Sequence, residues 1–156
     1  MAIRKIVLDG DEMLAKVCRP VEKFDERLAM LVGDMRDTLT SENGVGLAAP
    51  QVGVLKRVFI INTGEEIREF INPEIVSREG DQRTPEGCLS CPGLWGVTVR
   101  PQKIVGKAFD LKGNEFEFTG EDLMAKAFCH ENDHLNGILF KVRVIEWLER
   151  DDNQGK

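Results

Sequence analysis

The stretch His130-Glu131-Asn132-Asp133-His134 lies late in a predicted helix and is the strongest signal in the sequence. It has the form H-E-x-x-H. Four residues at about 100° each bring His134 back to within about 40° of His130, so both imidazoles face one point a turn apart. Glu131 lies beside them, where its carboxylate can reach a water on an ion without being a ligand. Because both histidines of the chain are in this pattern, we interpret it as a metal site rather than as a chance arrangement on an acidic helix.

A catalytic site of this kind normally has three protein ligands and one open position. No third histidine exists, so the remaining ligand has to be a carboxylate or a thiolate. Glu146 and Glu149 are downstream candidates, and they would make the protein an H-E-x-x-H metallopeptidase. Upstream, Cys88 offers a thiolate, which is a strong donor for zinc or ferrous iron. We interpret Cys88 as the third ligand.

Cys88 and Cys91 form a C-x-x-C pattern that allows two further interpretations. It could be half of a structural zinc site, closed by both histidines, or a redox pair. A closed four-ligand site leaves no water and predicts a binding module without hydrolysis. There is no second C-x-x-C, and Cys91 precedes a proline in an apolar context, so we expect Cys91 to serve packing. Cys18 and Cys129 are expected to be small buried hydrophobic residues.

The glycine-rich segment Gly44-Val-Gly-Leu-Ala-Ala-Pro-Gln-Val-Gly53 is a third feature. Taken alone it could be a plain turn after a helix. It is not a P-loop and lacks the dinucleotide-binding spacing. Gln51 offers a neutral amide donor, which suits a developing oxyanion because it stabilises charge without titrating.

The predicted elements indicate an α+β protein built from antiparallel strands around a helix. Apolar residues at three- and four-residue steps predict a helix over residues 25–42. Thr119 with Asp122 resembles a capped start of the helix that runs to about Leu135. The other expected elements are strands at 57–62, 69–72 and 74–78, a hairpin of 103–109 with 115–119, and a last short helix at 144–150.

Composition fits one soluble domain spanning residues 1–156, with 42% hydrophobic and 31% charged residues. No apolar run approaches the roughly 18 residues that cross a bilayer, so no membrane association is expected. The N-terminus does not resemble a secretory signal, so we expect a cytoplasmic protein with reduced cysteines. The net charge of −6 argues against nonspecific nucleic-acid binding.

Together the three segments resemble the peptide deformylase family. The family pattern G-φ-G-φ-A-A-x-Q matches Gly44–Gln51, E-G-C-L-S matches Glu86–Ser90, and H-E-x-D-H matches His130–His134. Their order and separation agree, and the likeness covers nearly the whole chain. The resemblance implies an enzyme that removes the formyl group from the initiator methionine of new bacterial polypeptides.

The resemblance also implies a set of roles. Cys88, His130 and His134 would bind one divalent ion, natively Fe²⁺, which Zn²⁺, Ni²⁺ or Co²⁺ can replace. A metal-bound water would be the nucleophile, with Glu131 as general base and then acid. The oxyanion would be held by the ion and by two donors. These donors would be the Gln51 side chain and the Leu89 N–H. Backbone groups of Val45, Gly46 and Gly87 would pair with an extended peptide. The methionine side chain would lie in a pocket near Leu123 and Ala127.

The chain departs from the family pattern at three places. Cys129 replaces a glutamine that often precedes the first histidine, at a position that does not ligate. Trp95 stands where some members carry an arginine near the substrate. The tail after Trp147 is short and acidic, whereas some members have a long basic helix suited to the ribosome. A transient ribosome contact is therefore not implied by that route.

Overall fold

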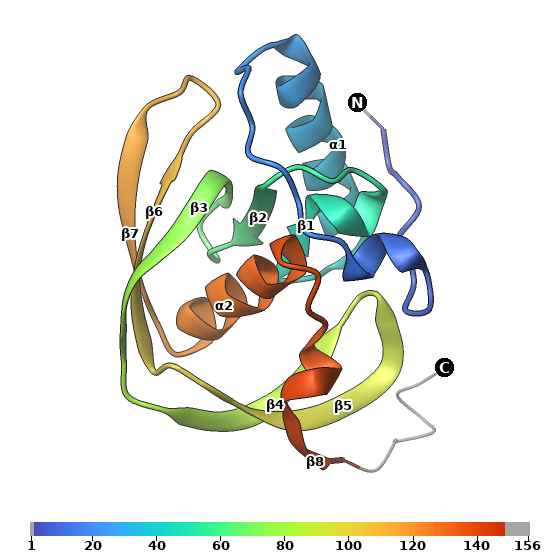
Figure 1. Cartoon of the computed structure of the whole chain (residues 1–156), viewed down its shortest axis with the longest axis vertical. Helices are drawn as coiled ribbons and strands as arrows, with labels where there is room; N and C mark the ends of the chain where they lie inside the picture. Colours follow the sequence, from blue (N-terminus) through green and yellow to red (C-terminus); the bar gives the residue numbers. More distant parts are fainter. Residues whose placement is uncertain (1, 149–156) are drawn as a thin grey trace.

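The computed structural model describes residues 2–148, which form two antiparallel sheets and two α-helices (Figure 1). The five-stranded sheet has the order β1-β2-β3-β6-β7, and the three-stranded sheet has the order β4-β5-β8. The strands are β1 Gly46–Ala48, β2 Val58–Asn62, β3 Ile67–Glu79, β4 Gln82–Cys88, β5 Cys91–Arg100, β6 Lys103–Phe109, β7 Glu115–Glu121 and β8 Val144–Trp147. The helices are α1 Glu26–Glu42 and α2 Leu123–Leu135, with 3₁₀ segments η1 Glu12–Ala15, η2 Ala49–Val52 and η3 Phe140–Arg143.

Helix α2 runs through the middle of the molecule, between the five-stranded sheet and the β4–β5 hairpin (Figure 1). Its apolar side is fixed by Phe128, whose ring packs edge-on to Phe59 and Phe70 at centroid distances of 5.0 and 5.5 Å. Below this ring lies Gly106, where a Cβ atom would lie 2.5 Å from the Phe128 ring. The helix can therefore approach the sheet only because residue 106 has no side chain. This confirms the expected antiparallel sheets around a central helix that carries H-E-x-x-H.

Helix α1 confirms the helix predicted over residues 25–42. Asp25 caps its start by accepting a hydrogen bond from the Leu28 N–H at 3.1 Å. Asn43 ends it in the left-handed conformation, with φ of 53°. The chain then turns directly into β1, so the end of α1 delivers the glycine-rich segment to the edge of the five-stranded sheet.

Three sequence predictions about secondary structure were wrong. The strands expected at 69–72 and 74–78 are one strand, β3, whose pairing with β6 is irregular between Ile71 and Glu74. Thr119 lies in β7, and Asp122 precedes α2 without a side-chain cap. The helix expected at 144–150 is instead a strand over its described part, β8, because Val144 and Trp147 pair with β5. Residues 149–150 lie outside the described residues.

The sequence analysis also missed β4 and β5, which form the hairpin that carries Cys88. Pro85 and several glycines interrupt the alternation by which strands are recognised. Within residues 2–148, no helix is long and apolar enough to cross a membrane.

Candidate metal centre and active site

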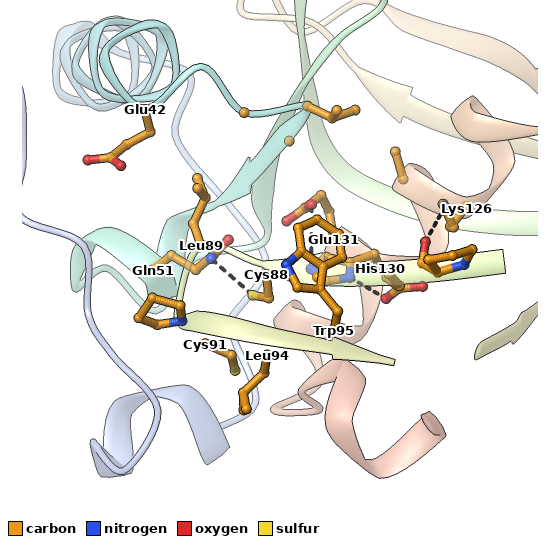
Figure 2. A pocket seen from close by; sticks show the side chains of 18 of the residues that line it. Glu42, Gln51, Cys88, Leu89, Cys91, Leu94, Trp95, Lys126, His130 and Glu131 are labelled. Atoms are coloured by element: carbon orange, nitrogen blue, oxygen red, sulfur yellow. Dashed lines mark hydrogen bonds and ion pairs between the residues drawn. The ribbon is translucent and has the colours of Figure 1, made fainter. Parts of the chain in front are cut away.

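A pocket of about 610 Å³ lies between the outer edges of the two sheets. Strand β1 is the end strand of the larger sheet and β4 that of the smaller one. Residues from both edges, from η2 and from α2 line the pocket, as Figure 2 shows for Gln51 of η2, Cys88 of β4 and Glu131 of α2. The pocket therefore exposes two strand edges beside one helix.

Cys88, His130 and His134 come together as predicted. Their ligand atoms all lie within 4.8 Å of one another. Within residues 2–148, they are the group of Cys, His, Asp or Glu side chains placed closely enough to hold a metal ion. The Cys88 Sγ is 3.4 Å from the His134 Nε2. Two imidazoles come from successive turns of α2 and the thiol from the end of β4. One sulfur and two nitrogen donors in a partly open pocket fit a divalent transition metal ion with a free position.

The His130 ring is oriented by Glu86, whose Oε2 is 2.5 Å from Nδ1. With Nδ1 donating to the carboxylate, Nε2 is left to face the other ligands. Burial opposes a charged imidazole, but Glu131 and Glu86 outweigh it and raise the pKa of His130. Burial lowers the pKa of His134 well below its usual value, which keeps that ring neutral and able to bind metal. Sequence reasoning quoted Glu86 in its motif but assigned it no role.

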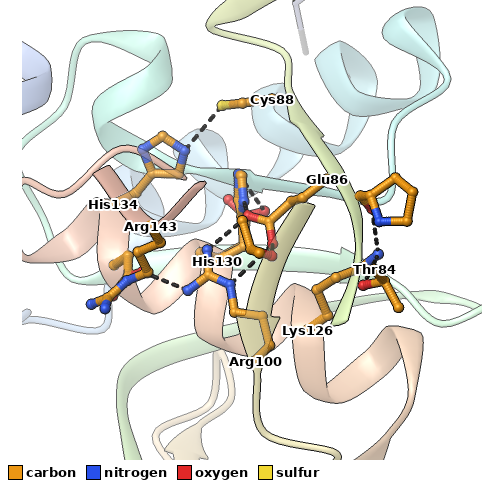
Figure 3. A network of polar contacts seen from close by, with 12 residues as sticks. Thr84, Glu86, Cys88, Arg100, Lys126, His130, His134 and Arg143 are labelled. Carbon is orange, nitrogen blue, oxygen red and sulfur yellow. Dashed lines mark hydrogen bonds and ion pairs between the residues drawn. The ribbon is translucent and has the colours of Figure 1, made fainter. Parts of the chain in front are cut away.

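A buried ion-pair network surrounds Glu86 (Figure 3). Arg100 contacts Glu86 through Nη2 at 2.7 Å and Asp133 through Nη1 at 2.7 Å. Arg143 then contacts Asp133 from η3 at 2.5 and 2.9 Å. Burial would raise the pKa of Glu86, but His130 and Arg100 hold it well below its usual range. The sequence analysis missed Arg100 and Arg143. The one signal for them was Asp133, an acidic residue inside the H-E-x-D-H motif that needs a cationic partner when buried.

Glu131 is buried and projects its carboxylate into the pocket beside His130. Its Oε2 is 4.0 Å from the His130 Nε2, and its Oε1 has no hydrogen-bond partner among the described residues. Burial raises the pKa of Glu131 to about 7. A Cβ on Gly46 would lie 2.6 Å from Oε2, so only glycine at that position leaves the carboxylate its place. Such a carboxylate can accept and return a proton near neutral pH.

The Gln51 amide is held in one orientation from both ends. Its Oε1 accepts a hydrogen bond from the Ala48 N–H at 3.0 Å, and its Nε2 donates to the Ser90 Oγ at 3.0 Å. Nε2 also lies 3.6 Å from the Cys88 Sγ, so its second hydrogen points toward the ligand group. Leu89 lies in the turn after Cys88 and also lines the pocket. Ser90, which fixes the amide, was not singled out from sequence.

The residues expected to contact a peptide all line this pocket. Leu123 and Ala127 of α2 lie near His130, and between them Lys126 donates to the Pro85 carbonyl oxygen at 2.9 Å. Gly46, the first residue of β1, and Val45 directly before it line the pocket on one side. Gly87 of β4 lines it on the other. The Trp95 indole covers Gly87, where a Cβ would lie 2.9 Å from the ring.

Neither alternative ligand set is supported within the described residues. Glu146 lies exposed on β8 and is not in the ligand group, while Glu149 lies outside the described part. Cys91 is buried beside Cys88 but is also not in that group.

An α+β fold with H-E-x-x-H on a central helix, and a Cys–His–His group open to a pocket, defines a metal-dependent hydrolase. The sequence model described as polypeptide deformylase matches residues 3–149, and the chain belongs to this family. The peptide deformylase of Caldicellulosiruptor bescii is 53% identical over 152 residues, covering 97% of this chain and 92% of the relative.

Two solved structures extend the likeness to the fold. A peptide deformylase from Legionella pneumophila has a TM-score of 0.90 at 48% identity, covering 92% of this chain and 86% of that one. The peptide deformylase from Thermotoga maritima has a TM-score of 0.90 at 38% identity, covering 92% and 99%. Relatives that are about 50% identical over most of the chain are named peptide deformylase, and on this likeness the chain is a peptide deformylase that acts on formylated new polypeptides.

Proposed function

We propose that Cys88, His130 and His134 hold the divalent ion with which this enzyme removes the N-formyl group from an initiator methionine. The observation that carries the proposal is the closeness of these three donors at a pocket that also contains the free Glu131 carboxylate. When bound, the ion polarises the formyl carbonyl and makes a coordinated water acidic near neutral pH. Thiolate and imidazole donors suit Fe²⁺, which we propose as the native ion, and also Zn²⁺, Ni²⁺ and Co²⁺.

Glu131 is the proposed proton carrier. Its buried carboxylate takes the proton from the attacking water and returns it to the departing amine. The pKa of about 7 that burial produces suits both directions of transfer. Gly46 supports this role because it leaves room for the carboxylate.

Gln51 and Leu89 are the proposed donors to the oxyanion. The Gln51 amide is fixed by Ala48 and Ser90, so it needs no reorganisation when negative charge develops. The Leu89 N–H belongs to the turn that directly follows the proposed ligand Cys88, and it is the proposed second donor.

The peptide is proposed to enter as an added strand between β1 and β4. Both are edge strands, so their outward N–H and C=O groups are available for pairing. Val45, Gly46 and Gly87 would supply those backbone groups, and the methionine side chain would lie against Leu123 and Ala127 of α2.

The cellular setting follows from the substrate. We propose that residues 1–156 act as one deformylase domain in the cytoplasm, where formylated polypeptides are made. A transient contact with the ribosome would suit such a substrate, and no membrane or specific nucleic-acid partner is proposed.

Formate release from formyl-Met-Ala by anaerobically prepared protein tests the proposal. Two companion peptides sharpen it: acetyl-Met-Ala, whose extra methyl crowds the Gln51 and Leu89 donors, and formyl-Gly-Ala, which lacks the methionine side chain. Misplacement by about 1 Å costs on the order of 10²-fold in rate, and a buried methionine contributes roughly 1.5–3 kcal/mol. We expect formyl-Met-Ala to have by far the highest kcat/KM. Comparable cleavage of the acetyl peptide would indicate a broader amidase.

Cys88→Ser separates the ligand sets. If Cys88 is the third ligand, this variant loses tightly bound zinc, whereas Glu146→Gln keeps it. The opposite result would favour the carboxylate alternative.

A further inference from the structure

Cys88 and Cys91 are direct neighbours across the β4–β5 hairpin. Cys88 ends β4, Cys91 begins β5, and the two are paired in register across the turn formed by Leu89 and Ser90. Directly paired residues in an antiparallel ladder have Cα atoms about 4.5–5.5 Å apart and side chains on the same face. A disulfide needs Cα atoms about 4.4–6.8 Å apart. The pair therefore meets the backbone requirement for a disulfide without movement of the strands.

The two thiols also share their surroundings. Cys91 is buried in a small apolar cluster with Leu14, Leu139 and Phe140, and Cys88 packs against the same cluster. The backbone register and the shared cluster thus agree that the two thiols lie on one face of the hairpin, against the same apolar residues.

Only this pair of cysteines is reachable from the pocket. Cys88 and Cys91 both line it, whereas Cys18 and Cys129 are buried in the core between α2 and the five-stranded sheet. A small oxidant that enters where the substrate enters meets Cys88 and Cys91 first. Figure 2 shows both on the hairpin that borders the pocket.

We propose that Cys88 and Cys91 are an oxidation site that takes hydrogen peroxide, and that the resulting disulfide and a bound metal ion exclude each other. The second half of the proposal rests on Cys88 being the third ligand in the proposed function. The first half concerns the two thiols alone.

The chemistry balances with one peroxide per pair. The Cys88 sulfur attacks one peroxide oxygen, the O–O bond breaks, and a sulfenic acid and one water form. The Cys91 sulfur then attacks the Cys88 sulfur, the S–S bond forms and the S–O bond breaks. The hydroxyl leaves as a second water with the Cys91 thiol proton. Two thiols are oxidised to one disulfide, and the peroxide is reduced to two waters.

Loss of the ion follows from the charge and position of the Cys88 sulfur. A metal ion needs the thiolate, and a disulfide sulfur carries no charge. Bonding to Cys91 also draws the sulfur toward β5, away from the His134 Nε2 at 3.4 Å. His130 and His134 alone then remain, which is one ligand short of a normal catalytic site.

The test treats the full chain, metal-free and zinc-loaded, with one equivalent of hydrogen peroxide under argon. Zinc is chosen because it has no redox chemistry of its own. Intact mass and the number of thiols alkylated after denaturation are followed, while a chromophoric chelator reports released zinc. We expect the mass to fall by two hydrogens and the reactive thiols to fall from four to two. In the zinc form, zinc release should match disulfide formation, and dithiothreitol should restore thiols and binding.

Two variants make the result specific. In Cys91→Ala no partner thiol is available, so Cys88 should gain oxygen atoms instead and dithiothreitol should not fully reverse it. Cys129→Ala is the matched control, because it removes a buried cysteine outside the pocket and should still form the disulfide. If Cys91→Ala folds poorly, Cys91→Val fills the same apolar cluster.

Three outcomes would overturn the proposal. The first is oxygenated Cys88 with an unreacted Cys91 in the metal-free wild type, and the second is a disulfide elsewhere. The third is a Cys88–Cys91 disulfide form that still binds one zinc with unchanged affinity. That last result would also remove Cys88 from the ligand set, whereas the first two leave the proposed function intact.

Discussion

The two sides of the active site are held in different ways. The α2 side, which carries His130, His134 and Glu131, is fixed by apolar packing of Phe128 against the larger sheet. The hairpin side, which carries Cys88 and Leu89, belongs to the smaller sheet and is joined to α2 by polar contacts, chief among them the buried Glu86–Arg100–Asp133 network.

Because the two sides are held differently, they should respond differently to substitutions. Apolar packing responds to volume, and its loss costs stability throughout the core. A buried ion pair responds to the loss of either partner, because an uncompensated charge is left in a low dielectric. Changes in the apolar core on the helix side should therefore affect overall stability, whereas changes in the buried network should affect both stability and the alignment of the ligands.

The largest expected effect is on the helix side. Glu131→Gln cannot accept a proton, so kcat for formyl-Met-Ala should fall by about 10²–10⁴-fold while bound metal stays near one per chain. Metal content by mass spectrometry and formate release are measured together. Glu146→Gln, an exposed carboxylate on β8, is the control and should keep both. Loss of metal with undiminished turnover per ion would remove Glu131 from its assigned role.

The next largest effect is expected when the buried ion-pair network between the hairpin and α2 is disrupted. Arg100→Met leaves Glu86 and Asp133 buried without their shared cation, which should lower the free energy of unfolding by about 3–5 kcal/mol. Urea unfolding measures it. Lys103→Met removes an exposed partner 4.0 Å from Glu121 and should cost about 0–1 kcal/mol. Equal costs for the two variants would mean that the buried network does not hold the hairpin.

A smaller effect distinguishes alignment from packing. Glu86→Gln weakens the contact that orients His130, so zinc affinity of the folded protein should fall about 10–100-fold. Phe128→Ala should lower the free energy of unfolding by about 3–5 kcal/mol yet leave zinc affinity close to wild type. Competition with a chelator, at temperatures where both variants are folded, gives the comparison. Similar losses of affinity in both variants would show that the two supports cannot be separated.

The smallest effect concerns the N-terminal segment that lies against the hairpin. Asp9 donates its N–H to the Ser90 carbonyl oxygen at 2.8 Å, and its carboxylate pairs with Lys141 of η3 at 2.6 Å. Because this pair is partly exposed, Lys141→Met should cost roughly 0.2–1 kcal/mol. Thermal unfolding at low salt and at about 1 M salt checks it, since salt should remove most of the difference. A cost that is unchanged by salt would point to packing of the lysine stem instead.

Local patterns were sufficient for much of the site. The spacing of His130 and His134 fixes their common direction on any helix, because helical geometry repeats every 3.6 residues. The apolar steps of residues 25–42 likewise gave α1 with nearly its observed bounds. The ligand role assigned to Cys88 depended on counting the histidines and finding one donor too few, and the structure brings that thiol to them.

Other parts could not be found by local patterns. The sequence at Val144–Trp147 allows a helix or a strand, and pairing with β5 selects the strand. The hairpin strands β4 and β5 carry proline and glycine, which weaken the alternation, although their mutual pairing stabilises them. Arg100 resembles an ordinary surface charge until the fold brings it to Glu86 and to Asp133, which is 33 residues further along.

By itself, the sequence determined the H-E-x-x-H helix, the donor types and the glycine-rich segment, because each depends on neighbours within one or two turns of chain. The tertiary structure alone decided that Glu131 has room beside Gly46, that Arg100 ties the hairpin to α2, and that the Cys88 and Cys91 sulfurs share one apolar cluster. These features depend on contacts between segments far apart in sequence, which the local sequence pattern does not encode, and burial in a low dielectric strengthens the ion pair among them.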